Sequence, residues 1–236
     1  MKKITIDEGN TSVKLAVFEG PQLVFKENYV TLNRVEALCK ECDRLIISSV
    51  KSNTIFDSFL NNEFAIILNS STPIPITNKY DKVNIGADRI ALAIGAAETF
   101  PNADVLVIDA GTCITFDFIN SKKEYLGGSI SPGINMRYNA LHKYTSKLPL
   151  LEGVEDIKLI GKNTENSIHS GIINGVRSEL DGIIERYTKI FPNLKVIVTG
   201  GDIKFFDKAL KNSIFANPNL LMEGLNKILD YNESYF

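Results

Sequence analysis

The sequence predicts an α/β fold built from two similar domains. A pattern of strand, Asp-x-Gly corner and strand occurs twice, and helices alternate with strands after each copy. The two corners begin at Asp7 and Asp109, which lie 102 positions apart (109 minus 7) in a chain of 236 residues. Since this spacing is close to half the chain, we expect a duplication. The boundary is expected in the loop at Pro101-Asn102, giving domains 1–101 and 102–236.

The first half begins with three expected strands, at residues 4–7, 13–18 and 23–25. The first strand ends at Asp7-Glu8-Gly9-Asn10-Thr11, and the turn Glu19-Gly20-Pro21 precedes the third. Helices are expected at 34–42 and 55–60, alternating with strands at 45–48 and 65–68. A helix rich in alanine and leucine is expected at 90–100.

The second half repeats the opening pattern. An apolar strand at 105–108 ends at Asp109-Ala110-Gly111-Thr112, and further strands are expected at 114–118 and 125–130, separated by a turn at Asn120-Ser121. A long helical region at 163–190, a strand at 196–199 and a final helix at 220–231 complete the half. Mixed strands with interleaved helices indicate two α/β domains.

The composition is that of an ordinary globular protein. The formal charge is −2, from 26 basic and 28 acidic residues that are interspersed along the chain. Nucleic acid and membrane surfaces are therefore not expected as partners. The chain has no stretch of about 20 apolar residues that could span a bilayer, and the apolar stretch after Lys3 stops at Asp7. We expect a cytoplasmic protein.

The three cysteines favour reduced thiols over a disulfide framework. Cys39 and Cys42 form a lone CxxC pair on the helix expected at 34–42. A structural zinc ion takes about four ligands. Only Cys113, His142 and His169 remain to complete such a set, and they lie far away in the sequence.

Each Asp-x-Gly corner combines residue types that suit a polyphosphate and its metal ion. Glycine lets the backbone approach a ligand and present N–H groups. The hydroxyls of Thr11 and Thr112 can donate to phosphate oxygens, while Asp7 and Asp109 can hold a cation or its waters. The competing interpretation is a pair of plain hairpin turns, because Asp, Asn and Gly are common turn residues. Occurrence at matching positions in two halves favours the ligand site.

Other nucleotide-binding motifs are absent. No two of the 16 glycines are spaced i, i+2, so the chain has no GxGxxG motif. Gly161-Lys162-Asn163-Thr164 resembles the tail of a Walker A motif, but position 156 is Asp. A third glycine element, Thr199-Gly200-Gly201-Asp202, follows an apolar strand. It is consistent either with a strand-to-helix turn or with an adenosine contact.

Asp88 is the candidate general base. Gly86-Ala87-Asp88-Arg89 opens the helix expected at 90–100, so Asp88 lies at or near its first turn. An acid in a first helical turn also complements the helix dipole, which is the competing structural interpretation. Phosphoryl transfer to an alcohol uses a base and an anion-binding side chain, and Asp88 with Arg89 could supply both.

Taken together, the motifs resemble the type III pantothenate kinases, within the superfamily of acetate and sugar kinases, Hsp70 and actin. The matching segments occur in family order across nearly the whole chain. They are Asp7-Glu8-Gly9-Asn10-Thr11, Gly86-Ala87-Asp88-Arg89, Asp109-Ala110-Gly111-Thr112, Leu126-Gly127-Gly128, Ser131-Pro132-Gly133, Gly161-Lys162-Asn163-Thr164 and Thr199-Gly200-Gly201. The resemblance implies two duplicated ribonuclease-H-like (actin-like ATPase) domains with mixed sheets flanked by helices.

The resemblance implies a reaction and a set of site residues. The γ-phosphoryl group of ATP passes directly to the primary hydroxyl of pantothenate, giving 4'-phosphopantothenate in the first step of coenzyme A biosynthesis. Asp88 looks like the general base. Pantothenate would be held by Tyr80, Gly86, Ala87, Asp88, Arg89 and Thr164. ATP would be bound by Asp7, Glu8, Gly9, Asn10, Thr11, Ser12, Val13, Lys14 and Thr112.

The resemblance also implies cofactors and an assembly. Asp109 would hold the monovalent cation, K⁺ or NH4⁺, and Mg²⁺ would accompany the phosphates, with Asp7 as its candidate ligand. A homodimer is implied. One departure from the family is Glu8, an acid where many relatives carry an apolar residue. A charge placed near the phosphates would be expected to weaken ATP affinity.

Two other functions remain open from the sequence. One is a kinase of another small alcohol, or a phosphohydrolase, on the same fold. The other is a nucleotide-binding regulator of the same fold that performs no chemistry, against which Asp88 and Asp109 argue.

Overall fold

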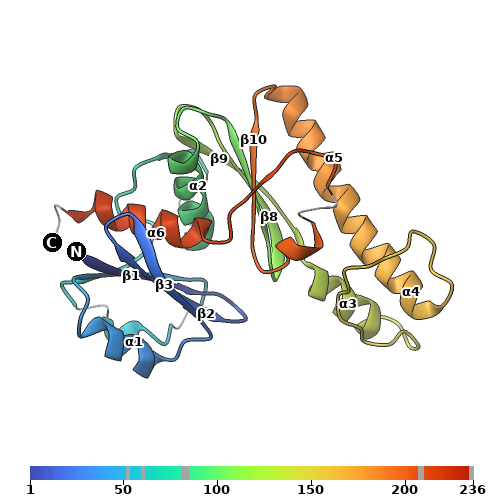
Figure 1. Cartoon of the computed structure of the whole chain (residues 1–236), viewed down its shortest axis with the longest axis horizontal. Coiled ribbons are helices and arrows are strands. Elements are labelled where there is room, and N and C mark those ends of the chain that lie inside the picture. Colours follow the sequence, from blue (N-terminus) through green and yellow to red (C-terminus); the bar gives the residue numbers. More distant parts are fainter. Residues whose placement is uncertain (52–53, 60–61, 81–84, 207–209, 234–236) are drawn as a thin grey trace. The chain divides into compact units, whose positions relative to one another are not determined.

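The computed structural model describes residues 1–51, 54–59, 62–80, 85–206 and 210–233. The chain forms two compact units, and many of the elements of each are labelled in Figure 1. The first unit comprises Met1–Asn102, Ile119–Gly127 and Asn219–Phe236, and the second comprises Ala103–Phe118 and Gly128–Pro218. The sequence-based domain limits, 1–101 and 102–236, stay a prediction.

A five-stranded sheet forms the centre of the first unit, in the order β3-β2-β1-β4-β5. Its strands are β1 (Lys2–Glu8), β2 (Val13–Glu19), β3 (Gln22–Asn28), β4 (Arg44–Ser49) and β5 (Ala65–Ile67). All five were predicted from the sequence, with bounds that differ by a few residues. β1 pairs antiparallel with β2 and parallel with β4. Because β1 lies in the middle of the sheet, the carboxylates at its end have neighbours on both sides.

The first unit also contains α1 (Leu32–Cys39), α2 (Ala87–Thr99) and α6 (Leu220–Tyr231). The sequence placed the first of these helices at 34–42, but it ends at Cys39, and the N–H of Cys42 donates to the carbonyl of Cys39 at 3.3 Å in a turn. Where a helix was expected at 55–60, the structure has a short 3-10 helix, Asp57–Phe59. Leu60 lies outside the described residues.

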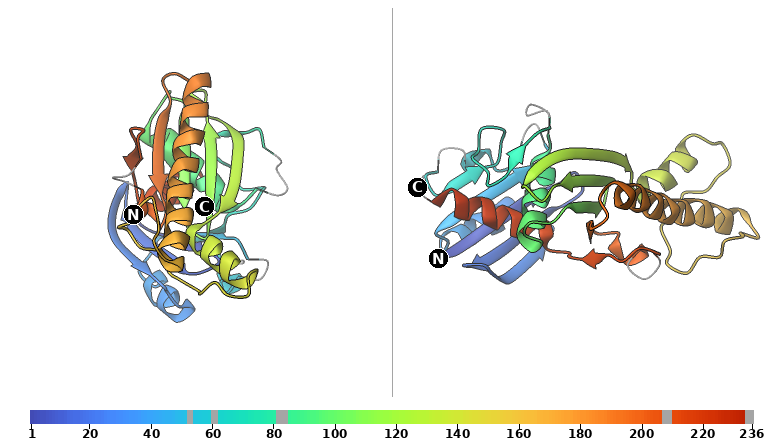
Figure 2. Two further views of the ribbon diagram at one scale, coloured as in Figure 1. Left: turned by 90° about the vertical axis from the view of Figure 1, so that its right-hand side faces the viewer. Right: turned by 90° about the horizontal axis from the view of Figure 1, so that it is seen from above.

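Helices α2 and α6 pack closely because glycines meet backbone where they touch. A Cβ at Gly224 would overlap the carbonyl oxygen of Ala91, and a Cβ at Gly95 would lie 2.6 Å from the carbonyl oxygen of Leu220. Figures 1 and 2 show the two helices side by side. The C-terminal helix therefore supports α2, which begins at the Gly86-Ala87-Asp88-Arg89 segment.

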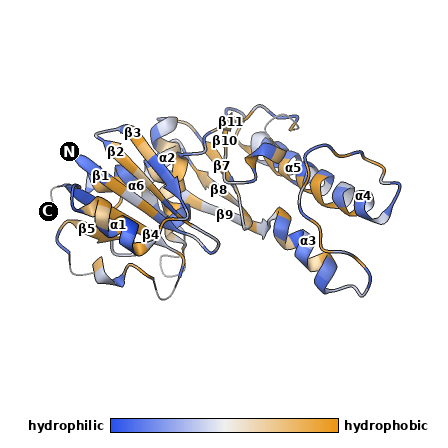
Figure 3. Ribbon diagram, turned by 60° about the horizontal axis from the view of Figure 1, so that its bottom comes forward, coloured by the Kyte–Doolittle hydropathy of each residue, from blue (hydrophilic) through white to orange (hydrophobic). Residues whose placement is uncertain are grey.

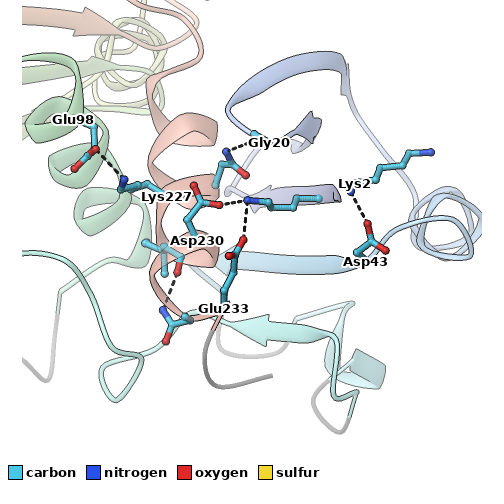
Figure 4. Close-up of polar contacts among 11 residues, drawn as sticks. Lys2, Gly20, Asp43, Glu98, Lys227, Asp230 and Glu233 are labelled. Carbon is cyan, nitrogen blue, oxygen red and sulfur yellow. Dashed lines mark hydrogen bonds and ion pairs between the residues drawn. The ribbon is translucent and has the colours of Figure 1, made fainter.

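Polar contacts also tie α6 to the first sheet and to α2 (Figure 4). The buried ammonium of Lys3 pairs with Asp230 and lies 3.4 Å from Glu233. Lys227 lies 3.1 Å from Glu98 of α2. A buried charge is costly unless it is paired, so loss of either partner of Lys3 would destabilise this end of the unit.

The second sheet has six strands in the order β11-β10-β7-β8-β9-β6. They are β11 (Phe215–Ala216), β10 (Lys195–Thr199), β7 (Val105–Ala110), β8 (Cys113–Ile119), β9 (Glu124–Pro132) and β6 (Thr77–Asn78). β7, β8, β9 and β10 were predicted, and β6 and β11 were not. β7 and β10 are hydrophobic along most of their length (Figure 3) and pair in parallel.

The helices of the second unit are α3 (Ile134–Lys143), α4 (Thr164–His169) and α5 (Gly175–Ile190). A π-helical turn, Ser170–Asn174, joins α4 to α5, so the helical region predicted at 163–190 is confirmed. α3 was not predicted. These helices and the strands enclose a core of buried residues that includes Phe116, Tyr138 and Leu180.

Within the described part of the chain, no helix is long and apolar enough to cross a membrane. The described residues likewise contain no group of three or more His, Cys, Asp or Glu side chains arranged to hold a metal ion.

Candidate active site

The first corner connects β1 to β2 through Gly9–Ser12. The N–H of Gly9 donates to the carbonyl of Ser12 at 3.0 Å, which closes the turn. Asp7 is only 5% exposed, whereas Asn10 and Thr11 face solvent. The corner therefore presents exposed polar groups above a buried carboxylate.

The carboxyl of Asp7 lies in a strongly perturbed electrostatic environment. Burial raises its pKa to about 6, and the carboxylates of Asp88 and Glu8 add to this effect. Lys14 opposes the rise: it is the cross-strand neighbour of Asp7, and its Nζ lies 3.9 Å from Oδ2. Asp7 and Asp88 are thus close enough to repel each other, although they lie 81 positions apart (88 minus 7) in the sequence.

Glu8 is a fully buried carboxylate with its own set of partners. In the pairing of β1 with β4, Glu8 lies beside Ser49. The hydroxyl of Ser49 donates to Oε2 of Glu8 at 2.8 Å, and the hydroxyl of Thr54 donates to the same oxygen. The N–H of Ile55 lies 3.5 Å from Oε1, as does Nζ of Lys51. Burial opposes ionisation, but these donors together hold the pKa of Glu8 below its usual value.

Asp88 lies in the first turn of α2, as the sequence predicted. Its Oδ1 accepts from the backbone N–H of Arg89 at 2.8 Å, so the carboxylate folds back over the start of the helix. A side chain at Gly86, the N-cap, would collide with this oxygen. Glycine at position 86 therefore allows Asp88 to take this conformation.

Arg89 and Tyr80 contact each other beside the start of α2. The guanidinium carbon of Arg89 lies 5.4 Å from the centroid of the Tyr80 ring, and Arg89 is 6% exposed. The Tyr80 ring packs against Gly127, where φ is +94° and a Cβ would lie 2.6 Å from the ring. Tyr125 lies nearby, with 6.1 Å between the two ring centroids. These contacts fix the plane of Tyr80 and the position of Arg89.

A cavity of about 970 Å³ opens beside the N-terminus of α2. Gly86 and Ala87 line one part of it, and Ser49, Val50 and Lys51 at the end of β4 line another. The volume suits a small-molecule substrate. The segment that carries Asp88 and the strand that packs on the first corner therefore border the same cavity.

The second corner connects β7 to β8 through Gly111 and Thr112. The N–H of Gly111 donates to the carbonyl of Cys113 at 2.9 Å. Asp109 is half-buried and lies against Gly200, where φ is +98° and a Cβ would stand 2.5 Å from Oδ1 of Asp109. Gly133 packs against the backbone of the same corner, because a Cβ at position 133 would overlap the carbonyl oxygens of Gly111 and Thr112.

The glycine pair at 200–201 therefore has a structural role at the second corner. The N–H of Asp202 donates to the carbonyl of Ala110 at 3.0 Å, which fastens this turn to the end of β7. Asp202 precedes a short 3-10 helix, Ile203–Phe205, but its side chain makes no capping hydrogen bond. The adenosine contact considered for this segment stays a prediction.

Thr164 lies elsewhere in the second unit, as the first residue of α4. The side chain of Asn163 caps this helix by accepting from the N–H of Asn166 at 2.8 Å. Thr164 lines a second cavity of about 930 Å³ together with Arg137 and Tyr144. The described residues that line this second cavity include Thr164 but neither Asp109 nor Thr112.

Three residues at the end of β4 were missed by the sequence analysis. Ser48 is the register neighbour of Asp7, Ser49 binds Glu8, and Lys51 lines the cavity. The available signal was an apolar strand that ends in Ser48-Ser49, is followed by Val50-Lys51 and pairs in parallel with the strand that carries Asp7. Carboxyl ends of neighbouring parallel strands meet at one edge of a sheet, where α/β proteins commonly bind ligands.

The surroundings of Asp7 suit a divalent cation. Two carboxylates, Asp7 and Asp88, repel each other there, which a cation would offset. The hydroxyl of Ser48 is fully buried beside Asp7 and has no hydrogen-bond partner among the described residues. Carboxylate and hydroxyl oxygens match the preference of Mg²⁺ for oxygen ligands and bound water. The residues present therefore fit the metal ion expected from the sequence.

Comparison with known proteins identifies the family. The model of the type III pantothenate kinase family matches residues 3–186. The chain belongs to the type III pantothenate kinase family. A type III pantothenate kinase of Christiangramia forsetii is 44% identical over 240 residues, which cover 98% of this chain and 99% of the relative. That of Phocaeicola vulgatus is 42% identical, with 98% of each chain covered. The family places the protein among the kinases of coenzyme A biosynthesis.

Solved structures with low sequence identity show the same actin-like ATPase fold. A Campylobacter jejuni protein of the Baf family has a TM-score of 0.62 at 22% identity, covering 98% of this chain and 99% of its own. The activator of 2-hydroxyisocaproyl-CoA dehydratase from Clostridium difficile, solved with bound ADPNP, has a TM-score of 0.55 at 12% identity, covering 100% and 97%. The predicted fold class is confirmed.

Proposed function

We propose that the protein transfers the γ-phosphoryl group of ATP to the primary hydroxyl of pantothenate, producing 4'-phosphopantothenate and ADP. The observation that carries this proposal is that Asp88 lies close enough to Asp7 to raise its pKa, while Gly86 and Ala87, which precede Asp88, line a cavity of about 970 Å³. Asp7 belongs to a corner whose residue types suit phosphate binding. Asp88 lies in the first turn of α2, the helix that borders the cavity. The two functions of a kinase site, phosphate binding and activation of an alcohol, therefore converge.

Asp88 is the proposed general base. Its carboxylate takes the proton of the pantothenate hydroxyl as the hydroxyl oxygen forms a bond to the γ-phosphorus. The bond from that phosphorus to the β–γ bridging oxygen breaks, and its electron pair leaves with ADP. Folding back over the start of α2 keeps Asp88 beside the cavity-lining residues Gly86 and Ala87.

ATP is proposed to bind the backbone and side chains of both corners. The residues are Asp7, Glu8, Gly9, Asn10, Thr11, Ser12, Val13 and Lys14 of the first corner, with Thr112 of the second. Lys14 and the N–H groups around Gly9 supply positive potential, and the two threonine hydroxyls supply donors. Mg²⁺, when bound through Asp7, neutralises charge that develops on the phosphates.

Asp109 is proposed to hold K⁺ or NH4⁺. Its carboxylate lies under Gly200, so backbone carbonyls from neighbouring turns can complete an oxygen-lined site. Pantothenate is proposed to contact Tyr80, Gly86, Ala87, Arg89 and Thr164. The stacking of Arg89 on Tyr80 supports this role by holding the guanidinium in one place.

A homodimer in the cytoplasm completes the proposal. Apolar side chains of the second unit that lie in solvent support self-association, among them Tyr144 and Leu159, each 79% exposed. Light scattering coupled to size-exclusion chromatography should give twice the mass of one chain, and a monomer at micromolar concentration would contradict this part.

An acceptor panel tests the reaction. Purified protein, Mg-ATP and K⁺ should produce ADP in the presence of pantothenate, and mass spectrometry should detect 4'-phosphopantothenate. Other small alcohols, such as glycerol and pantetheine, are the comparison. Faster turnover of another alcohol, or ATP hydrolysis independent of any acceptor, would overturn the proposed substrate.

A further inference from the structure

The Cys39–Cys42 pair is a motif that the proposed kinase site does not use. Both cysteines are free and half-buried, and both pack against the hydrophobic core of the first unit. Their thiols form a hydrogen bond with each other. Among the described residues, no third His, Cys, Asp or Glu joins them in a group that could hold a metal ion. Since a structural zinc ion takes about four ligands, the pair suits sulfur chemistry better than metal binding.

The backbone between the two cysteines forms a tight turn. Cys39 is the last residue of α1, and the N–H of Cys42 donates to the carbonyl of Cys39 at 3.3 Å. A turn of four residues holds the Cα atoms at its two ends within about 7 Å. Disulfides span Cα separations of roughly 4.4–6.8 Å. The two sulfur atoms can therefore join without a large movement of the backbone.

The surroundings of the turn favour the thiolate of Cys42. Its pKa lies below the usual value, chiefly because the Cys39 thiol donates a hydrogen bond to its sulfur. Lys2 acts in the same direction, whereas burial and Asp43 oppose it. The backbone N–H of Lys2 donates to Asp43 at 2.6 Å (Figure 4), and its Nζ lies 3.2 Å from Oε2 of Glu41. Because the thiolate is the form of cysteine that attacks a disulfide, Cys42 is the nucleophile of the pair.

Cys39 supplies the second sulfur. The hydrogen bond to Cys42, together with burial, raises the pKa of Cys39, so Cys39 keeps its proton while Cys42 is a thiolate. Once the sulfur of Cys42 is part of a disulfide, it no longer carries a negative charge, and Cys39 ionises more readily. The two cysteines can therefore react in sequence.

We propose that Cys39 and Cys42 form a reversible disulfide by exchange with a small disulfide such as oxidised glutathione. The thiolate of Cys42 attacks one sulfur of that molecule, its S–S bond breaks, and one glutathione leaves and takes up a proton. Cys39 then loses its proton and attacks the sulfur of Cys42, and the second glutathione leaves as a thiol. The protein loses two electrons and two protons, and the oxidant gains them.

This exchange site and the proposed kinase site lie at opposite ends of β4. Cys42 comes just before the strand, whereas Ser48, the register neighbour of Asp7, lies near its other end. A strand rises by about 3.3 Å per residue, so six residues keep the two places well apart. The inference therefore stands independently of the proposed function.

Mass spectrometry of the reduced protein treated with oxidised glutathione tests the inference. The wild type should lose about 2 Da, the mass of two hydrogen atoms, and dithiothreitol should restore the original mass. Trypsin cleaves after Lys40, so oxidation should leave peptides 35–40 and 41–44 joined by the disulfide. The bond should also raise the midpoint of thermal denaturation, because a cross-link restrains the unfolded chain. A fall in the midpoint would contradict the fit of the turn to a disulfide.

Single variants separate the roles of the two cysteines. Cys39→Ser should stop at the mixed disulfide and gain the mass of one glutathione at Cys42. Cys42→Ser should react about tenfold more slowly than the wild type, because the remaining thiol lacks a lowered pKa. Cys113→Ser is the matched control, since Cys113 is also free and half-buried but belongs to the second unit. It should form the Cys39–Cys42 bond at the wild-type rate.

Two results would overturn the inference. One is a wild-type protein whose Cys39 and Cys42 both stay reduced in excess oxidised glutathione. The other is stable addition of glutathione to either cysteine without linkage of peptides 35–40 and 41–44. Neither measurement uses kinase activity, so failure of this inference is distinguishable from failure of the proposed function.

Discussion

The two Asp-x-Gly corners share a sequence pattern and differ in what surrounds them. In the first, Asp7 is nearly buried, faces Lys14 and is influenced by two other carboxylates, those of Asp88 and Glu8. In the second, the residue after Asp109 is a buried alanine. There the neighbours are the backbone of Gly133 and Gly200, which approach too closely for any side chain.

The difference shows that the motif specifies a turn, and that packing decides the chemistry. Charged side chains gather at the first corner, which suits a metal-bound phosphate chain and proton transfer. Backbone packs around the second, which suits a weakly hydrated monovalent cation held by oxygen atoms.

The largest effect is expected from Asp88→Asn. The amide cannot accept the hydroxyl proton, so kcat should fall by about 10² to 10⁴. Binding of ATP and pantothenate, followed by calorimetry, should persist. Turnover equal to that of the wild type would remove Asp88 from the mechanism and leave the first corner without its base.

Asp7→Asn should stabilise the ligand-free protein above pH 6 even as it impairs catalysis. The pKa of Asp7 is about 6 in the folded state, above its ordinary value of 3.8. Protonated Asp7 therefore contributes fully to the unfolding free energy below pH 3.8, and this contribution is lost as the pH rises through 6 and the buried carboxyl ionises. The difference corresponds to at most about 3 kcal/mol of unfolding free energy.

Urea denaturation at several pH values measures this effect. At pH 4 the two proteins should have similar unfolding free energies, because most of Asp7 is then protonated, and at pH 7.5 the variant should be more stable. If the unfolding free energies of the two proteins differed by the same amount at pH 4 and pH 7.5, ionisation of Asp7 would not destabilise the folded protein.

Glycine substitutions compare the packing of the two corners. Gly200→Ala should destabilise the fold by about 2 kcal/mol, since φ is +98° and the new Cβ overlaps the carbonyl of Ala110. Gly9→Ala should cost under about 1 kcal/mol, because its Cβ would lie 3.4 Å from the nearest backbone oxygen. Thermal denaturation measures both, and equal losses would contradict the contrast.

The smallest effect is expected from Asp109→Asn. Loss of the carboxylate charge should reduce the activation of kcat/KM by K⁺ or NH4⁺ by about tenfold, the scale of one charge-assisted interaction. Activity is measured across a range of each chloride salt, with Na⁺ as the control. A variant that still responds fully to K⁺ would show that the cation binds elsewhere.

Much of the fold could be predicted because it follows from local patterns. Strands such as β1 and β7 are short apolar segments that end at turn residues, and α6 has the predicted bounds. β6 could not be found, because two residues carry no periodicity and Thr77–Asn78 is a strand only through pairing with β9. α3 was not predicted although Ile134, Tyr138 and Leu141 recur at helical spacing; only the first two are buried, and polar residues lie between them.

The candidate site was predictable only where the chemistry lies in one motif. Asp7, Asp88 and Asp109 stand beside glycines in recognisable segments. Lys51 and Ser48 have no such segment, and their relevance follows from the parallel pairing of β4 with β1. The sequence also gave no sign that Glu8 would be buried against β4, since a charged residue at a strand end is usually exposed.

Diffraction from crystals grown with a non-hydrolysable ATP analogue, pantothenate, Mg²⁺ and Rb⁺ in place of K⁺ tests the division of roles between the corners most directly. We expect phosphate oxygens in contact with residues 7–14 and with Thr112, and an anomalous rubidium peak at the carboxylate of Asp109. A rubidium peak at Asp7, or phosphates that contact neither corner, would contradict this division of roles.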